Sequence, residues 1–135
     1  MTVGSWNPDS EKAKSTVTLN SELLQRFLTL SRSDLLDDLE QQLDTREQEV
    51  YAQLMRCDKE QWFEALTAFS DEDIEHLMKF FTKAERLPGW QAGADSPAIW
   101  LGKVLKKRGV GISKALTLWI KANSDNRYLP HGPLL

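Results

Sequence analysis

Apolar side chains recur three or four positions apart between residues 20 and 123, which is the spacing of one face of an α-helix. No segment alternates apolar and polar residues as a half-buried strand does, and the chain shows no internal repeat. A chain of 135 residues suits one domain. We therefore predict an all-α fold, a single compact bundle of five to seven short helices over 20–123, with a flexible N-terminal arm over 1–19 and an extended C-terminal tail over 124–135.

Capping residues divide this region into separate helices. Side chains that can accept a hydrogen bond from a first-turn backbone N–H precede five of the apolar stripes: Asn20 or Ser21, Ser33, Thr45 with Gln48, Asp58 with Gln61, and Ser70 with Asp73. Because no Gly or Pro lies between residues 33 and 57, the second and third of these helices are also compatible with one continuous helix. Ser96 followed by Pro97 predicts a further helix that Gly109 ends, and the last helix spans about 112–123.

The composition is that of an ordinary globular protein without disulfides or metal centres. Hydrophobic residues make up 41% of the chain, and five Trp and five Phe supply large groups for a core. The single cysteine, Cys57, excludes an intrachain disulfide and any site built from several thiolates, so we expect no metal and no cofactor. The N-terminal sequence lacks the features of a secretory signal, and no apolar stretch approaches the ~20 residues of a membrane span. We expect a cytoplasmic protein that makes no membrane contact.

Charge is distributed unevenly along the chain, although the net charge is only −3. Residues 1–76 contain 17 Asp and Glu against 7 Lys and Arg, a balance of −10, whereas residues 77–135 contain 3 against 10, a balance of +7. Four of the cations lie close together in the sequence, beside Trp100 and a Gly-Val-Gly turn: Lys103, Lys106, Lys107 and Arg108. A localised positive field attracts an anionic partner, although the helix dipole also favours cations in a last turn on purely structural grounds.

We interpret this basic cluster as the binding surface of a small non-enzymatic protein-interaction module. In this hypothesis Lys103, Lys106, Lys107 and Arg108 attract an acidic protein partner, while three further residues supply apolar contacts: Trp90, Tyr128 and Leu129. Aromatic anchors surrounded by charge are typical of protein–protein interfaces. Self-association is a variant in which the basic end of one copy meets the acidic half of another. For Tyr128 and Leu129, a structural role in covering one end of the bundle stays open.

Nonspecific nucleic-acid binding through the same cluster is the first alternative. Two helices joined by Gly109-Val-Gly111 resemble a helix-turn-helix outline, and no acidic residue interrupts the segment from Ser96 to Ser124. The exposed positions expected on the second of these helices offer few side chains that read base edges: Ser113, Lys114, Thr117 and Lys121. The acidic half of the chain would also repel a polyanion that extends beyond the cluster.

A small enzyme is the second alternative, because catalytic residues can converge in a fold without leaving a sequence motif. His76 follows acidic residues but lacks the companions that a metal site needs, and acidic neighbours disfavour the thiolate of Cys57. The carboxylates between residues 34 and 49 alternate with apolar positions as on a solvated helix face, and Gly109-Val-Gly111 lacks the rest of a phosphate-binding loop. The sequence assigns no catalytic residue and favours a protein that is not an enzyme, without deciding the question.

Overall fold

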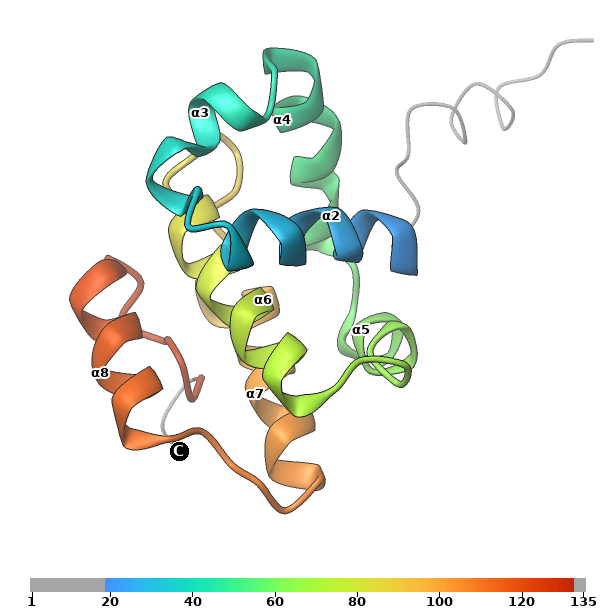
Figure 1. Cartoon of the computed structure of the whole chain (residues 1–135), viewed down its shortest axis with the longest axis vertical. Helices are drawn as coiled ribbons and strands as arrows, with labels where there is room; N and C mark the ends of the chain where they lie inside the picture. Colours follow the sequence, from blue (N-terminus) through green and yellow to red (C-terminus); the bar gives the residue numbers. More distant parts are fainter. Residues whose placement is uncertain (1–18, 133–135) are drawn as a thin grey trace, which may run out of the picture.

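The computed structural model describes residues 19–132 and confirms the all-α class, since no strand occurs over this range (Figure 1). The α-helices are α2 (Ser21–Arg32), α3 (Leu39–Gln42), α4 (Thr45–Tyr51), α5 (Lys59–Ala65), α6 (Asp71–Ala84), α7 (Pro97–Lys107) and α8 (Lys114–Asn123). Short 3₁₀ helices are η1 (Leu36–Asp38), η2 (Ala52–Arg56) and η3 (Gly93–Asp95). Apart from Leu19, the predicted N-terminal arm lies outside the described residues, as do residues 133–135 of the tail.

Helix α6 lies at the centre of the described fold and packs against α7, α2 and α8 (Figure 1). Phe80 of α6 stacks on Phe27 of α2 with ring centroids 4.2 Å apart, and Phe81 meets Trp62 of α5 edge to face at 5.2 Å. Buried aromatic pairs of this kind add about 0.5–1.5 kcal/mol each beyond the free energy of burying their area. None of the described helices is both long and apolar enough to cross a bilayer.

Four of the predicted helix starts are confirmed. Asn20 Oδ1 accepts a hydrogen bond from Leu23 N at 2.9 Å before α2, and Ser96 caps α7 with Pro97 in its first turn. Capping boxes precede α5 and α6 at the expected residues: Asp58 with Gln61, and Ser70 with Asp73. Each cap gives a partner to backbone N–H groups that an α-helix cannot satisfy internally.

The capping box of α4 is formed one residue earlier than predicted. Asp44 Oδ1 accepts a hydrogen bond from Glu47 N at 2.8 Å, and Glu47 Oε1 accepts one from Asp44 N at 3.1 Å, so the predicted pair of Thr45 and Gln48 is wrong. An Asp cap and a Glu in the first turn also place negative charge where the helix dipole favours it. Glu47 pairs in addition with Arg26 of α2, which fixes α4 against α2.

The segment after α2 forms shorter elements than the predicted second helix. Ser33 is the C-cap of α2 rather than the N-cap of a second helix: Asp34 follows it with φ +59°, and residues 36–42 form η1 and the single turn of α3. Leu43 is extended, so the helices of this region are separate rather than continuous. The deep burial of Leu39 and Leu43 shows that the apolar pattern locates the core positions correctly although it overestimates the length of the helix.

Residues 124–132 form no helix, and they pack against the bundle. Beyond the extended backbone of Ser124, a turn over 127–131 brings Leu129, which is only 4% exposed, into the core. Gly132 lies so close to α7 that an added Cβ would be 3.3 Å from Ile99 Cγ2. Leu129 therefore covers one end of the bundle, and the prediction that it supplies an exposed contact to a partner is corrected.

Trp90, also predicted as a partner contact, belongs to the core. Its side chain has 0% exposure, and its ring lies 6.2 Å from that of Phe80 and 6.4 Å from that of Phe27. The indole Nε1 donates a hydrogen bond to Gln48 O at 2.8 Å, which joins the α6–α7 connection to α4. Because no part of the ring reaches solvent, Trp90 cannot anchor a partner, and this prediction is corrected as well.

Replacing Trp90 by Phe should lower the free energy of unfolding by roughly 2–4 kcal/mol, because a cavity forms and the Gln48 carbonyl keeps only its hydrogen bond from Ala52 N. The matched control is Trp62→Phe, since Trp62 also has 0% exposure and its Nε1 is buried without a hydrogen-bond partner among residues 19–132. Urea denaturation followed by far-UV circular dichroism measures both variants. Equal losses in the two variants would show that the Trp90 hydrogen bond contributes nothing.

Candidate functional site

Five exposed lysines of α7 and α8 form what we call the basic surface: Lys103, Lys106, Lys107, Lys114 and Lys121. No acidic residue occurs from residue 97 to residue 123, and within residues 19–132 none of these lysines takes part in an ion pair. Burial lowers the pKa of His131, and the nearby charges of Lys106 and Lys121 lower it further. Lys106 of α7 and Lys121 of α8 therefore lie near the same residue of the tail, whereas Lys107 lies against Phe63 of α5.

Arg108, which was predicted to belong to this surface, binds the chain itself. Its guanidinium group donates hydrogen bonds to Phe69 O at 2.8 Å, to Leu66 O at 3.1 Å and to Asp71 Oδ1 at 3.0 Å. These bonds tie the C-terminal end of α7 to the connection between α5 and α6. Arg108 is thus a structural residue rather than a free cation, which corrects its predicted role.

Lys107 and Tyr128 remain accessible enough for the predicted role. Lys107 Nζ lies 4.2 Å from the ring centroid of Phe63, a cation–π contact that leaves the ammonium group at the surface. Tyr128 is half-buried, and its hydroxyl oxygen accepts a hydrogen bond from Arg127 Nη2 at 3.0 Å. Their binding roles stay predictions, as do those of Lys103 and Lys106.

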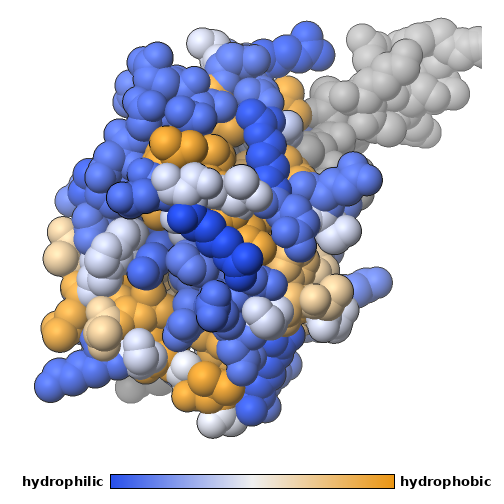
Figure 2. Space-filling model, viewed as in Figure 1, coloured by the Kyte–Doolittle hydropathy of each residue, from blue (hydrophilic) through white to orange (hydrophobic). Residues whose placement is uncertain are grey.

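Two exposed apolar residues, rather than Trp90 and Leu129, accompany the basic surface. Val110 is 54% exposed and Leu118 is 58% exposed, and they are the exposed large hydrophobic residues of the described range. Leu118 follows Lys114 by four positions and precedes Lys121 by three, so the three side chains share one face of α8. This spacing was visible in the sequence. Figure 2 shows small hydrophobic patches between hydrophilic side chains, including patches over α8.

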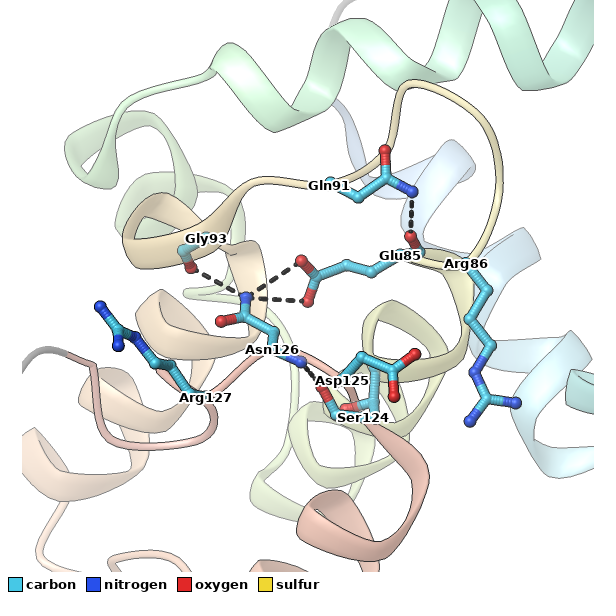
Figure 3. A pocket seen from close by; sticks show the side chains of 9 residues that line it. Glu85, Arg86, Gln91, Gly93, Ser124, Asp125, Asn126 and Arg127 are labelled. Carbon is cyan, nitrogen blue, oxygen red and sulfur yellow. Dashed lines mark hydrogen bonds between the residues drawn. The ribbon is translucent and has the colours of Figure 1, made fainter.

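A second feature is a pocket of about 500 Å³, which the sequence analysis did not anticipate (Figure 3). It lies where three segments meet: the C-terminal end of α6, the connection to α7, and the chain that follows α8. Glu85, only 8% exposed, contributes a buried carboxylate to this pocket, and Figure 3 shows that carboxylate directed toward Asn126. We call this feature the Glu85 pocket.

Uncharged groups satisfy the carboxylate of Glu85. Its Oε1 accepts hydrogen bonds from Ala92 N at 3.2 Å and Asn126 Nδ2 at 3.1 Å. Its Oε2 accepts one from Ser96 Oγ at 3.2 Å, and Asn126 Nδ2 also lies 3.4 Å from it. Burial raises the pKa of Glu85 above its ordinary value, and these hydrogen bonds offset only part of the increase. The pocket therefore holds a carboxylate in an environment that disfavours its charge.

The sequence did contain a signal for Glu85. It follows Phe81 by four positions and Met78 by seven, so it lies on the apolar stripe of α6, where a carboxylate is unexpected. Its partners Ala92, Ser96 and Asn126 lie up to 41 residues away, and no local pattern predicts that they meet.

The other candidates for chemistry are not assembled into a site. His76 Nδ1 lies 3.1 Å from Ser31 Oγ, a contact between α6 and α2. Burial, together with the charge of Asp58, raises the pKa of the Cys57 thiol, which disfavours a nucleophilic thiolate. Within residues 19–132, no three His, Cys, Asp or Glu side chains are arranged to hold a metal ion.

Comparisons of the chain with protein-family models, with curated proteins and with solved structures gave no match.

Replacing Arg108 by Met should lower the free energy of unfolding by about 1–2 kcal/mol, because Leu66 O, Phe69 O and Asp71 each lose one hydrogen bond. Lys106→Met in the same helix serves as the control and should change stability by less than about 0.5 kcal/mol, as is usual for an exposed substitution. Thermal and urea denaturation of the two variants test this difference. If Lys106→Met costs as much as Arg108→Met, the internal bonds of Arg108 are not what stabilises this region.

The pKa of Glu85 predicts how stability depends on pH. A raised folded pKa means that the native protein binds a proton more tightly than the unfolded chain between the ordinary value of 4.5 and the folded value. Stability relative to Glu85→Gln should therefore rise as the pH falls through this window and become constant below it. Urea denaturation at several pH values, with an NMR titration of the Glu85 carboxyl carbon, measures both quantities. A midpoint at or below 4.5 would contradict the prediction.

Proposed function

We propose that this is a cytoplasmic protein that binds an acidic protein partner through the basic surface, with Leu118 as an apolar anchor. The single observation that carries the proposal is the set of exposed lysines on α7 and α8 that make no ion pair within residues 19–132. A cluster of uncompensated charge raises the rate of encounter with a molecule of opposite charge.

The ion pairs of the described residues support a partner from outside the chain. Those pairs involve the cations Arg26, Arg32, Lys83 and Arg108. Of these, Arg108 follows α7 and pairs with Asp71, and Lys83 Nζ lies 6.0 Å from the ring centroid of Trp119 in α8 and pairs with Asp37. Even Glu75, which lies beside α8, forms no ion pair with these lysines, so they remain uncompensated within residues 19–132.

Leu118 favours a protein over a nucleic acid as the partner. Charge alone attracts both, because lysine pairs with phosphate as readily as with carboxylate. An exposed leucine on the same helix face gains free energy by being buried in a protein interface, whereas a phosphate backbone offers it no apolar contact. Nucleic-acid binding through the same lysines is therefore the second candidate.

The test is a double charge reversal, Lys106→Glu with Lys121→Glu. The wild-type protein is used as bait in a native lysate, the captured protein is identified and purified, and its affinity is measured by isothermal titration calorimetry. The reversal should weaken binding at least tenfold, since it removes two attractive charges and adds two repulsive ones. A Leu118→Ser variant should mainly increase the dissociation rate, because the anchor acts after encounter.

The matched control is Arg46→Glu with Lys59→Glu, which changes the net charge equally at exposed residues of α4 and α5. This control should bind as the wild type does, and an equal loss in both double variants would refute the proposal. Gel-shift titration with duplex DNA at increasing salt tests the second candidate. Binding to DNA that both depends on Lys106 and Lys121 and is insensitive to Leu118→Ser would replace the proposal with nucleic-acid binding.

A further inference from the structure

The segment that forms η1, α3 and most of α4 carries a surplus of negative charge, and α3 and α4 lie at one end of the molecule (Figure 1). Residues 33–50 contain seven Asp and Glu against a single cation, Arg46. Two of these acids pair within the chain, Asp37 with Lys83 and Glu47 with Arg26. The others are exposed, form no ion pair within residues 19–132 and make up what we call the acidic surface: Asp34, Asp38, Glu40, Asp44 and Glu49.

A hollow of about 300 Å³ opens beside the acidic surface and is partly apolar. Leu36, which is half-buried, lines it together with the buried Leu39 and Leu87. Asp38 and Glu40 of the acidic surface also line it. The hollow therefore offers an aliphatic side chain an apolar contact next to two exposed carboxylates.

The two cations that line this hollow are bound within the chain. Lys83 Nζ pairs with Asp37 Oδ1 at 2.6 Å, and Arg86 Nη2 donates a hydrogen bond to Asn123 O at 2.9 Å. The lining holds three carboxylates against two cations, a balance of −1. The hollow thus keeps the negative sign of the surface around it.

The basic surface complements this arrangement in charge and in the position of its apolar group. Leu118, 58% exposed, stands between Lys114 and Lys121 on one face of α8, whereas the hollow places leucines next to carboxylates. Within one copy the two surfaces do not neutralise each other, since no ion pair of residues 19–132 joins a lysine of α7 or α8 to the acidic surface. Both surfaces therefore remain available to another molecule.

From this complementarity we propose that the acidic partner of the basic surface is a second copy of this chain. Leu118 of one copy enters the hollow of the other copy, where Lys114 and Lys121 pair with Asp38 and Glu40. The inference rests on the proposed function, because it uses the same surface, and it names the partner. Each copy carries both surfaces, so the contact forms twice in a two-fold dimer or repeats from head to tail.

The test follows association of the full-length protein by sedimentation velocity from about 10 μM to 1 mM, a range that covers weak specific contacts. The wild type should change from monomer to dimer or larger species as its concentration rises. Raising the salt from about 0.1 M to 1 M shortens the Debye length from about 10 Å to 3 Å and should weaken the association about tenfold or more. Leu118→Ser should weaken it several-fold at the lower salt, because the hollow then receives no aliphatic group.

Two double variants exchange the charges of the contact. Lys114→Glu with Lys121→Glu reverses one side, and Asp38→Lys with Glu40→Lys reverses the other. Each double variant alone should stay monomeric, because its contact joins like charges. An equimolar mixture of the two should associate about as tightly as the wild type, because opposite charges face each other again.

The matched control is Glu60→Lys with Glu64→Lys, which makes the same change in net charge at exposed residues of α5 and should associate as the wild type does. Far-UV circular dichroism checks that every variant is folded. The inference is overturned if the wild type stays monomeric throughout, if the mixture of folded variants does not associate, or if the α5 control loses association as well. A monomeric wild type that captures a different acidic protein through Lys106 and Lys121 overturns this inference alone and leaves the proposed function standing.

Discussion

The buried carboxylate of Glu85 joins three segments that are distant in the chain. It belongs to the C-terminal end of α6, and it accepts hydrogen bonds from Ala92 and Ser96 in the connection to α7 and from Asn126 after α8. A carboxylate can be buried only when its acceptor sites are filled, because each missing donor exposes the full cost of desolvation. The three segments therefore stabilise one another, and the arrangement requires all of them at once.

The same principle holds elsewhere in the fold, where side chains that bind backbone carbonyls fix the irregular connections. Trp90 fixes the α6–α7 connection through Gln48 O, and Arg108 fixes the α5–α6 connection through Leu66 O and Phe69 O. Arg108 supplies donors to carbonyls of an irregular segment, which has no internal ladder of hydrogen bonds, whereas Trp90 attaches an irregular segment to a carbonyl of α4. Trp90 and Arg108, which were predicted from the sequence as binding residues, therefore fix connections between helices.

This distinction explains how much of the molecule the sequence predicts. The all-α class and the starts of α2, α5, α6 and α7 follow from local patterns, because a cap and its helix lie within a few residues. Trp90 and Arg108 each form a hydrogen bond with a residue 42 positions away in the sequence. No local pattern reveals such a contact. Glu85 and Leu118 could have been found, since each breaks the amphipathic pattern of its helix, one with a charge on the apolar stripe and the other with an apolar group on the polar face.

The charge asymmetry of the sequence survives folding, since no ion pair within residues 19–132 joins the lysines of α7 and α8 to a carboxylate. Helix α8 packs mainly against α6, whose first turn holds Asp71 and Asp73. Asp71 pairs with Arg108 and Asp73 with Arg32, whereas Glu75 lies beside Ser113 and Leu116 and forms no ion pair within residues 19–132. Repulsion among those lysines is a cost that an acidic partner would remove on binding. The ion pairs that the fold uses thus involve other cations, and the lysines of α7 and α8 stay available to a partner.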